Sequence, residues 1–60
     1  MADEVMFQEA MKAAQEGQYA RARDLLTRLL RSNQNNPDYW LWMSAVVETP
    51  QEQAYCLKNL

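Results

Sequence analysis

The amino-acid sequence predicts an all-α fold in which four short helices pack antiparallel within one domain covering residues 1–60. Apolar residues in the first half recur every three or four positions, which is the period of a helix with one buried face. One glycine and two prolines interrupt this pattern and divide the chain into segments. The chain is 48% hydrophobic and 23% charged, which is typical of a folded helical protein and not of a disordered one. The expected helices cover residues 3–16, 18–32, 37–48 and 50–60.

The expected first helix has one broad apolar face and one polar face. Asp3 is a suitable N-cap, and its charge favours the positive end of the helix dipole. Gly17 should end the helix, because glycine adopts the left-handed conformation without a steric cost. The apolar face consists of Met6, Phe7, Ala10, Met11, Ala13 and Ala14.

The expected second helix is the most clearly amphipathic of the four. Since only Gly17 separates it from the first helix, the two should form a tight antiparallel hairpin. Arg21, Arg28 and Arg31 lie on its polar face within about a quarter-turn of one another. Its apolar stripe consists of Tyr19, Ala22, Leu25, Leu26, Leu29 and Leu30.

The third and fourth helices are predicted from their starting residues. Asn36 followed by Pro37 is a helix start, because the amide caps and proline occupies a position whose N–H makes no helical hydrogen bond. Thr49, followed three residues later by Glu52, indicates a capping box at the start of the fourth helix. No C-cap signal follows the fourth helix, so the chain is interpreted as a possible piece of a longer protein.

Size and composition exclude several kinds of protein. A domain of about this length buries only about 60% of the surface of its unfolded chain, so its stability is marginal. Cys56 is the only cysteine and there is no histidine, which excludes an internal disulfide and a structural zinc site; no cofactor is expected. The net charge of -2 argues against nucleic acid as a partner. No apolar run is long enough for a membrane span or a secretion signal, so a cytoplasmic location is expected.

The residues from Glu16 to Ala22, followed by Leu26, Leu29 and the Asn35-Asn36-Pro37 loop, resemble a tetratricopeptide repeat. In that family a glycine closes the first helix, an aromatic residue and an alanine begin the second, and an asparagine/proline loop leads to the next repeat. Trp40, Met43 and Ser44 match the large, apolar and small positions that open the following repeat. The segment from Pro37 to Glu48 also looks like a variant common in bacterial repeat proteins.

This resemblance implies a fragment of a right-handed α-solenoid. Repeat one covers about residues 3–36, and a compressed and truncated repeat two covers about residues 37–60. Glu9 and Gln34 depart from the family pattern, and the turn between the third and fourth helices is about three residues shorter than in the family.

The third helix is the expected functional element, because nine uncharged residues from Tyr39 to Val47 cover every side of it. Four helices cannot bury all of them, so some of Leu41, Trp42, Ala45 and Val46 should stay near the surface and mark an interface. For Trp42, partner contact and partial core burial are equally favoured. The expected core consists of Met6, Ala10, Tyr19, Ala22, Leu25, Leu26, Leu29, Trp40, Met43, Val47 and Leu57.

The sequence therefore predicts a protein-protein interaction module and not an enzyme. Family members bind ligands along the first helix of each repeat, which implies a partner-binding face formed by the first and third helices. Its candidate residues are Phe7, Met11, Leu41, Trp42, Ala45 and Glu48. The expected partner is an apolar helix, a peptide or a neighbouring repeat, whose identity the sequence leaves open.

Two alternatives remain open at this stage. The apolar third helix could instead drive formation of a homodimer. In a weaker alternative, the row formed by Arg21, Arg28 and Arg31 binds an acidic surface. Cys56 has no histidine to activate it and the carboxylates form no buried pair, so no catalytic residue is expected.

Overall fold

The computed structural model describes residues 2–60, and within them the chain forms four helices and no strand. The helices are α1 (Ala2–Gln15), α2 (Tyr19–Ser32), α3 (Pro37–Val46) and α4 (Pro50–Lys58). The prediction of an all-helical fold is confirmed, with helix ends that differ by one or two residues from those expected. Asp3 is the exception among the caps, because it lies inside the first turn of α1.

Gly17 makes the hairpin between α1 and α2 as expected. Its φ of 80° lies in the left-handed region, and it is the only residue with a positive φ in residues 2–60. The backbone N–H of Gln18 donates to the carbonyl of Ala13 at 2.8 Å, and that of Gly17 donates to Ala14 at 3.2 Å. These two bonds form a Schellman motif, which satisfies the last carbonyls of α1 and reverses the chain.

The starts of α3 and α4 also follow their predicted caps. The Asn36 side chain accepts a hydrogen bond from the backbone N–H of Asp38 at 2.9 Å. At α4 the hydroxyl of Thr49 accepts from the N–H of Glu52 at 3.1 Å and donates to the Glu52 carboxylate at 3.0 Å. The carboxylate therefore reaches the hydroxyl of the cap instead of its backbone N–H, which is the usual partner in a capping box.

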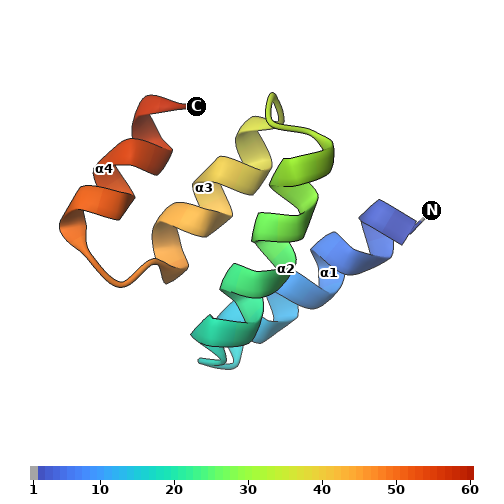
Figure 1. The fold of residues 1–60 in the computed structure, drawn as a ribbon. Helices are drawn as coiled ribbons and strands as arrows, with labels where there is room; N and C mark the ends of the chain where they lie inside the picture. Colours follow the sequence, from blue (N-terminus) through green and yellow to red (C-terminus); the bar gives the residue numbers. More distant parts are fainter. Residues whose placement is uncertain (1) are drawn as a thin grey trace.

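The helices follow one another across the molecule, with α1 and α4 at opposite ends (Figure 1). α2 packs against α1 and α3, α4 packs against α3, and α1 also contacts α3. Among these four helices, α4 makes no close backbone contact with α1 or α2. No helix in residues 2–60 is long and apolar enough to cross a membrane.

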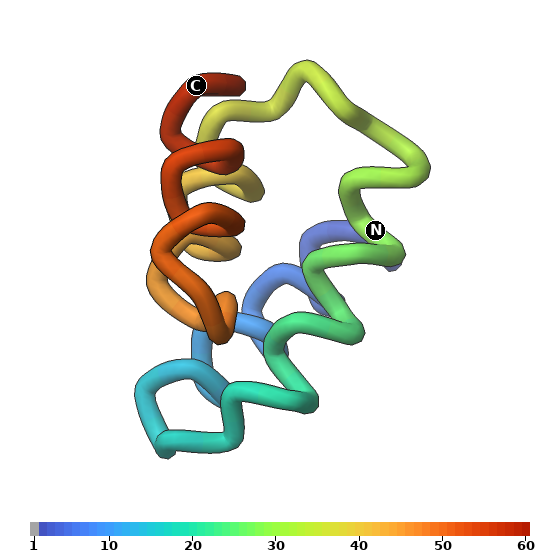
Figure 2. The backbone as a smooth tube through the Cα atoms, turned by 60° about the vertical axis from the view of Figure 1, so that its left-hand side comes forward, coloured from blue at the N-terminus to red at the C-terminus, as the bar shows by residue number. Residues whose placement is uncertain are grey.

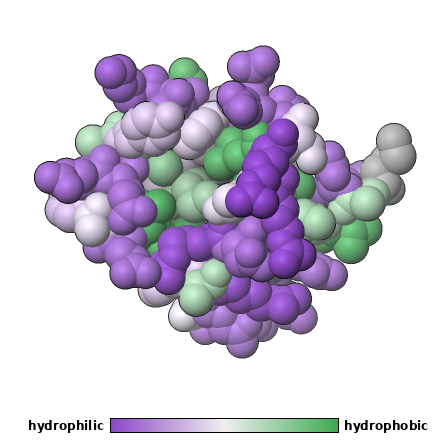
Figure 3. Space-filling model, viewed as in Figure 1, coloured by the Kyte–Doolittle hydropathy of each residue, from purple (hydrophilic) through white to green (hydrophobic). Residues whose placement is uncertain are grey.

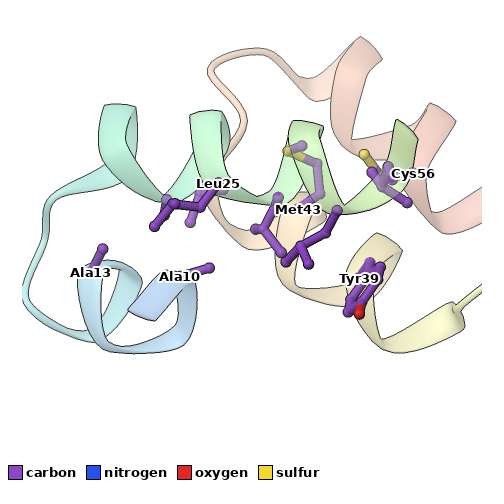
Figure 4. Close-up of a cluster of buried hydrophobic side chains, with 11 residues drawn as sticks. Ala10, Ala13, Leu25, Tyr39, Met43 and Cys56 are labelled. Carbon is purple, nitrogen blue, oxygen red and sulfur yellow. The ribbon is translucent and has the colours of Figure 1, made fainter. Parts of the chain in front are cut away.

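One buried apolar cluster joins the four helices, and Figure 4 shows that its side chains come from each of them. Leu26 and Leu29 of α2 are its largest fully buried side chains. Of the residues expected in the core, Met6, Trp40 and Val47 are partly buried and pack against the cluster. The other buried members of that set are Ala10, Ala22, Leu25, Leu26, Leu29 and Met43.

The expectation of core burial is wrong for two residues. Tyr19 is 51% exposed and lies outside the buried cluster, because it is the first residue of α2, next to the hairpin turn. Leu57 is 46% exposed because Thr49 and Pro50 set the start of α4 so that Cys56 faces α3. Leu57 then lies about 100° further around the helix.

The structure also buries residues that were expected elsewhere. Tyr39 was not expected in the core, and Val46 was among those expected near the surface, yet both are buried. Both lie on the side of α3 that faces the first hairpin, where the Tyr39 ring meets the Phe7 ring edge-on at 4.9 Å. Thus α3 is covered by three neighbouring helices on several sides, and its exposed apolar residues are fewer than the sequence suggests.

Candidate functional site: the exposed side of the third helix

The residues predicted to bind a partner do not share one environment. Leu41 is 50% exposed, and Ala45 and Glu48 are also exposed. Phe7, Met11 and Trp42 are partly buried, so they lie at the border between core and surface. Leu41 and Ala45 lie four positions apart and form one stripe along α3, whereas Glu48 follows the C-cap Val47 and lies beyond the end of the helix. The stripe of Leu41 and Ala45 is called the α3 outer stripe below.

A comparison of α1 with α3 explains why this stripe is exposed. Met6 and Trp40 lie 34 positions apart, and the same spacing pairs Ala10 with Ser44. Both members of the first pair are partly buried, and both members of the second are buried. These positions face the second helix of their own hairpin, so the two hairpins use equivalent positions for their internal packing.

On the side of α3 that meets the first hairpin, residues 34 positions apart differ in burial. Tyr39, Met43 and Val46 are buried there. The equivalent positions of α1 are exposed, because residues 2–60 place no helix on that side of the first hairpin. Two of them are charged, which suits a face in contact with water. These equivalent positions are Val5, Glu9 and Lys12.

On the opposite side of each helix, the residues of α1 are partly buried and their equivalents in the second hairpin are exposed. On α1, Phe7 and Ala14 are partly buried and pack against the core, because α3 lies beside them. Their equivalents are Leu41 of α3, which is exposed because nothing within residues 2–60 follows α3 on that side, and Glu48, which is exposed just beyond the end of α3. The α3 outer stripe is therefore the uncovered counterpart of a face that α1 uses to hold α3.

Glu48, two residues beyond the end of α3, takes part in an internal contact that the sequence did not predict. Arg23 of α2 pairs with the Glu48 carboxylate at 3.0 Å and donates to the carbonyl of Val46 at 2.7 Å. The guanidinium thus satisfies one of the last carbonyls of α3, at the negative end of that helix. One signal was available: Arg23 borders the leucine stripe of α2, whereas the other arginines of that helix lie away from it.

A second surface lies on another face of the molecule, between α2 and α4. Two open hollows of about 640 Å³ and about 380 Å³ share Thr27 of α2 and Tyr55 of α4 in their lining, so they form one continuous depression. We call it the α2–α4 trough. Trp40 and Met43 of α3, with its C-cap Val47, form its floor. Figure 2 shows the backbones of α2 and α4 standing apart, and Figure 3 shows apolar surface in the middle of this face, bordered by hydrophilic side chains.

The predicted arginine row is divided by its contacts. Arg21 pairs with Glu9 at 3.5 Å, and Arg28 pairs with Asp24 at 3.1 Å. Arg31 belongs to none of the ion pairs found within residues 2–60, and it lines the α2–α4 trough. The three residues therefore do not present one continuous cationic surface.

Cys56 is buried beneath the trough. Burial raises the pKa of its thiol, and the nearby Glu52 carboxylate raises it further. Both effects favour the neutral thiol over the nucleophilic thiolate. Within residues 2–60, no three His, Cys, Asp or Glu side chains come together in a group that could hold a metal ion.

No family model, curated protein or solved structure matches this chain.

Proposed function

We propose that this chain is a protein-protein interaction module of the tetratricopeptide type, which binds an apolar helix of a partner along the α3 outer stripe. The proposal rests on one observation: residues that are partly covered in the first hairpin have exposed equivalents in the second. Phe7 and Ala14 are partly covered by the next hairpin, whereas Leu41 and Glu48, at the same positions of the second hairpin, are not.

The packing of α3 on the first hairpin indicates the chemistry of the partner helix. Tyr39, Met43 and Val46 of α3 form a row at helical spacing, and they are buried where α3 meets the first hairpin. A helix that lies beside α3 as α3 lies beside α1 needs a similar row of one aromatic and two aliphatic side chains. Leu41 and Ala45 provide the apolar surface that such a row covers, and Trp42 lies at its edge.

The stripe is small, which limits the affinity that it supports alone. Full burial of one leucine contributes about 1.5–3 kcal/mol, and Leu41 is already half covered by its own helix and neighbours. Association of two proteins costs at least several kcal/mol of lost freedom. Tight binding therefore requires further contacts, for which Leu57 of α4 is exposed on the side of the second hairpin away from the trough.

A homodimer through the apolar third helix is the main alternative, and it uses the same stripe. It is less favoured because most of the apolar residues of α3 are buried or partly buried within the chain, which leaves little surface for a symmetric contact. The binding of an acidic surface by the arginine row is weaker still, because Arg21 and Arg28 already pair with carboxylates.

The test selects helical peptides from a displayed library against the whole chain and then measures their affinity for two matched variants. Leu41→Glu places a charge on the outer stripe, and Val5→Glu places one on the opposite end of the molecule at a residue that is 53% exposed. We expect Leu41→Glu to weaken binding by about tenfold or more and Val5→Glu to leave it unchanged. Circular dichroism of both variants checks that the helices remain intact.

Two outcomes contradict the proposal. Peptides that bind Leu41→Glu as tightly as the unchanged chain place the contact elsewhere. If no peptide is selected and sedimentation shows concentration-dependent dimers that Leu41→Glu dissociates, the homodimer is the correct reading.

A further inference from the structure

We infer that the α2–α4 trough is a second protein-binding site, which receives an amphipathic helix with an acidic residue positioned to pair with Arg31. This site lies on a different face from the α3 outer stripe and does not depend on it. The inference rests on the shape of the trough, on the distribution of charge along it and on the weak attachment of α4.

The shape of the trough suits a helix better than a small ligand. Arg23, Thr27 and Arg31 line it from one side and follow one another at every fourth position of α2. The trough therefore extends over at least two helical turns, or about 12 Å. Its floor is apolar along this length, with Met43 and Val47 toward one end and Trp40 toward the other.

Charge along the trough is uneven and defines the orientation of an occupant. At one end Arg23 is already paired with Glu48, and Glu52 accepts a hydrogen bond from Thr49. At the other end Arg31 is the only charged side chain in the lining. The amides of Gln34 and Asn59 and the hydroxyl of Thr27 accompany it. An occupant that places a carboxylate beside Arg31 and apolar side chains over Met43 and Val47 complements both ends.

Because α4 has few contacts with the rest of the chain, such an occupant should stabilise it. α4 is nine residues long, and Cys56 is its only buried residue. Its contact with the rest of the chain is with α3, including an edge-on contact between Tyr55 and Trp40 at 5.8 Å. Helices this short are marginal without packing. A partner helix lying between α2 and α4 covers the second side of α4 and should therefore protect its backbone from hydrogen exchange.

The probe is a stapled helical peptide with leucines on two successive turns and a glutamate one turn further on, paired with a control peptide in which glutamine replaces the glutamate. We measure binding to the full chain by isothermal titration and follow the amides of α4 by hydrogen exchange. The glutamate peptide should bind about two- to fivefold more tightly than the glutamine peptide, as expected for a partly exposed ion pair. Bound peptide should slow exchange in α4 more than in α1.

Matched variants locate the contact. Arg31→Gln should abolish the difference between the two peptides, whereas Arg28→Gln, which removes the same charge from α2 at a residue outside the lining of the trough, should keep it. Thr27→Trp should prevent binding, because the indole fills the trough at the residue shared by both hollows. Thr27 is exposed, so this substitution leaves the buried core unchanged.

Several results overturn the inference. The inference is wrong if the peptides do not bind or if they bind equally well to Thr27→Trp. It is also wrong if they lose affinity for Leu41→Glu instead, because that result assigns them to the α3 outer stripe. If decanoate binds in place of either peptide and its binding depends on Arg31 in the same way, the site is one for an anionic lipid and not for a helix. Because Leu41→Glu leaves the trough intact, failure at one surface is distinguishable from failure at the other.

Discussion

Arg23 provides the sharpest test of how α2 holds α3. Its guanidinium has two partners, the Val46 carbonyl at 2.7 Å and the Glu48 carboxylate at 3.0 Å. The two partners differ in exposure, because Val46 is buried whereas the Glu48 side chain is 71% exposed. Arg23→Met keeps the apolar stem and removes both contacts, and Glu48→Gln removes only the charge of one partner.

The structure predicts that these substitutions have unequal effects. Arg23→Met leaves a buried residue's carbonyl without its donor, which costs about 1–3 kcal/mol. Glu48→Gln should cost less than about 1 kcal/mol, since an ion pair with one exposed partner is screened by water. A chain of this length has a total stability of about 3–9 kcal/mol, so the first effect is a large fraction of the whole and the second is not.

Urea unfolding followed by far-UV circular dichroism measures both effects, and a thermal melt repeats the comparison. A loss of 1 kcal/mol corresponds to about 4–8 °C in a domain of this size. Added salt should reduce the small effect of Glu48→Gln further and should leave most of the effect of Arg23→Met. Equal losses for the two variants, or no loss for Arg23→Met, contradict the view that the carbonyl contact anchors the end of α3.

Three further predictions concern the core, the hairpin turn and the buried thiol. Leu26→Ala should cost about 2–5 kcal/mol in urea unfolding because Leu26 is fully buried. The same change at Tyr19, which lies outside the core, should cost less than about 1 kcal/mol, and similar losses at both positions contradict the assigned core. Gly17→Ala should lower the melting temperature through a loss of about 1–2 kcal/mol, because its φ of 80° is unfavourable for alanine although a Cβ meets no atom there; an unchanged melting temperature excludes the left-handed turn. Because burial and Glu52 raise the pKa of the Cys56 thiol, folded protein should be alkylated more slowly than urea-unfolded protein at the same mildly alkaline pH. The same shift makes folding less favourable as the pH rises above the ordinary thiol pKa of 9.0, since the unfolded chain loses the proton first, and Cys56→Ala should remove this part of the pH dependence.

The features that the sequence predicted well are local ones. Gly17 ends α1, Asn36 caps α3 and Thr49 caps α4, because each needs only a few adjacent residues to make its turn or hydrogen bond. The leucines of α2 are likewise buried where their helical period places them. Local chemistry and a single periodic face were therefore enough for the fold class and the helix positions.

The features that the sequence missed depend on how separate helices meet. The burial of Val46 and the exposure of Leu57 depend on how α3 and α4 are rotated about their own axes. The sequence of α3 does not indicate its rotation, because apolar residues occur on almost every side of this helix. The contact between Arg23 and the Val46 carbonyl joins residues 23 positions apart. The α2–α4 trough exists because α4 packs against α3 and makes no close backbone contact with α2, a property of the assembled hairpins and not of any one segment.

We propose the α3 outer stripe as an uncovered packing face that binds a partner helix. The most direct measurement is the paramagnetic relaxation of methyl groups by a soluble agent, with Leu41 and Val5 compared in the free chain and with a selected helical peptide bound. Both side chains are about half exposed, at 50% and 53%, so both should relax strongly in the free chain. Bound peptide should protect Leu41 alone. Protection of Val5 alone, equal protection of both, or a Leu41 methyl already shielded in the free chain would contradict the proposed binding face.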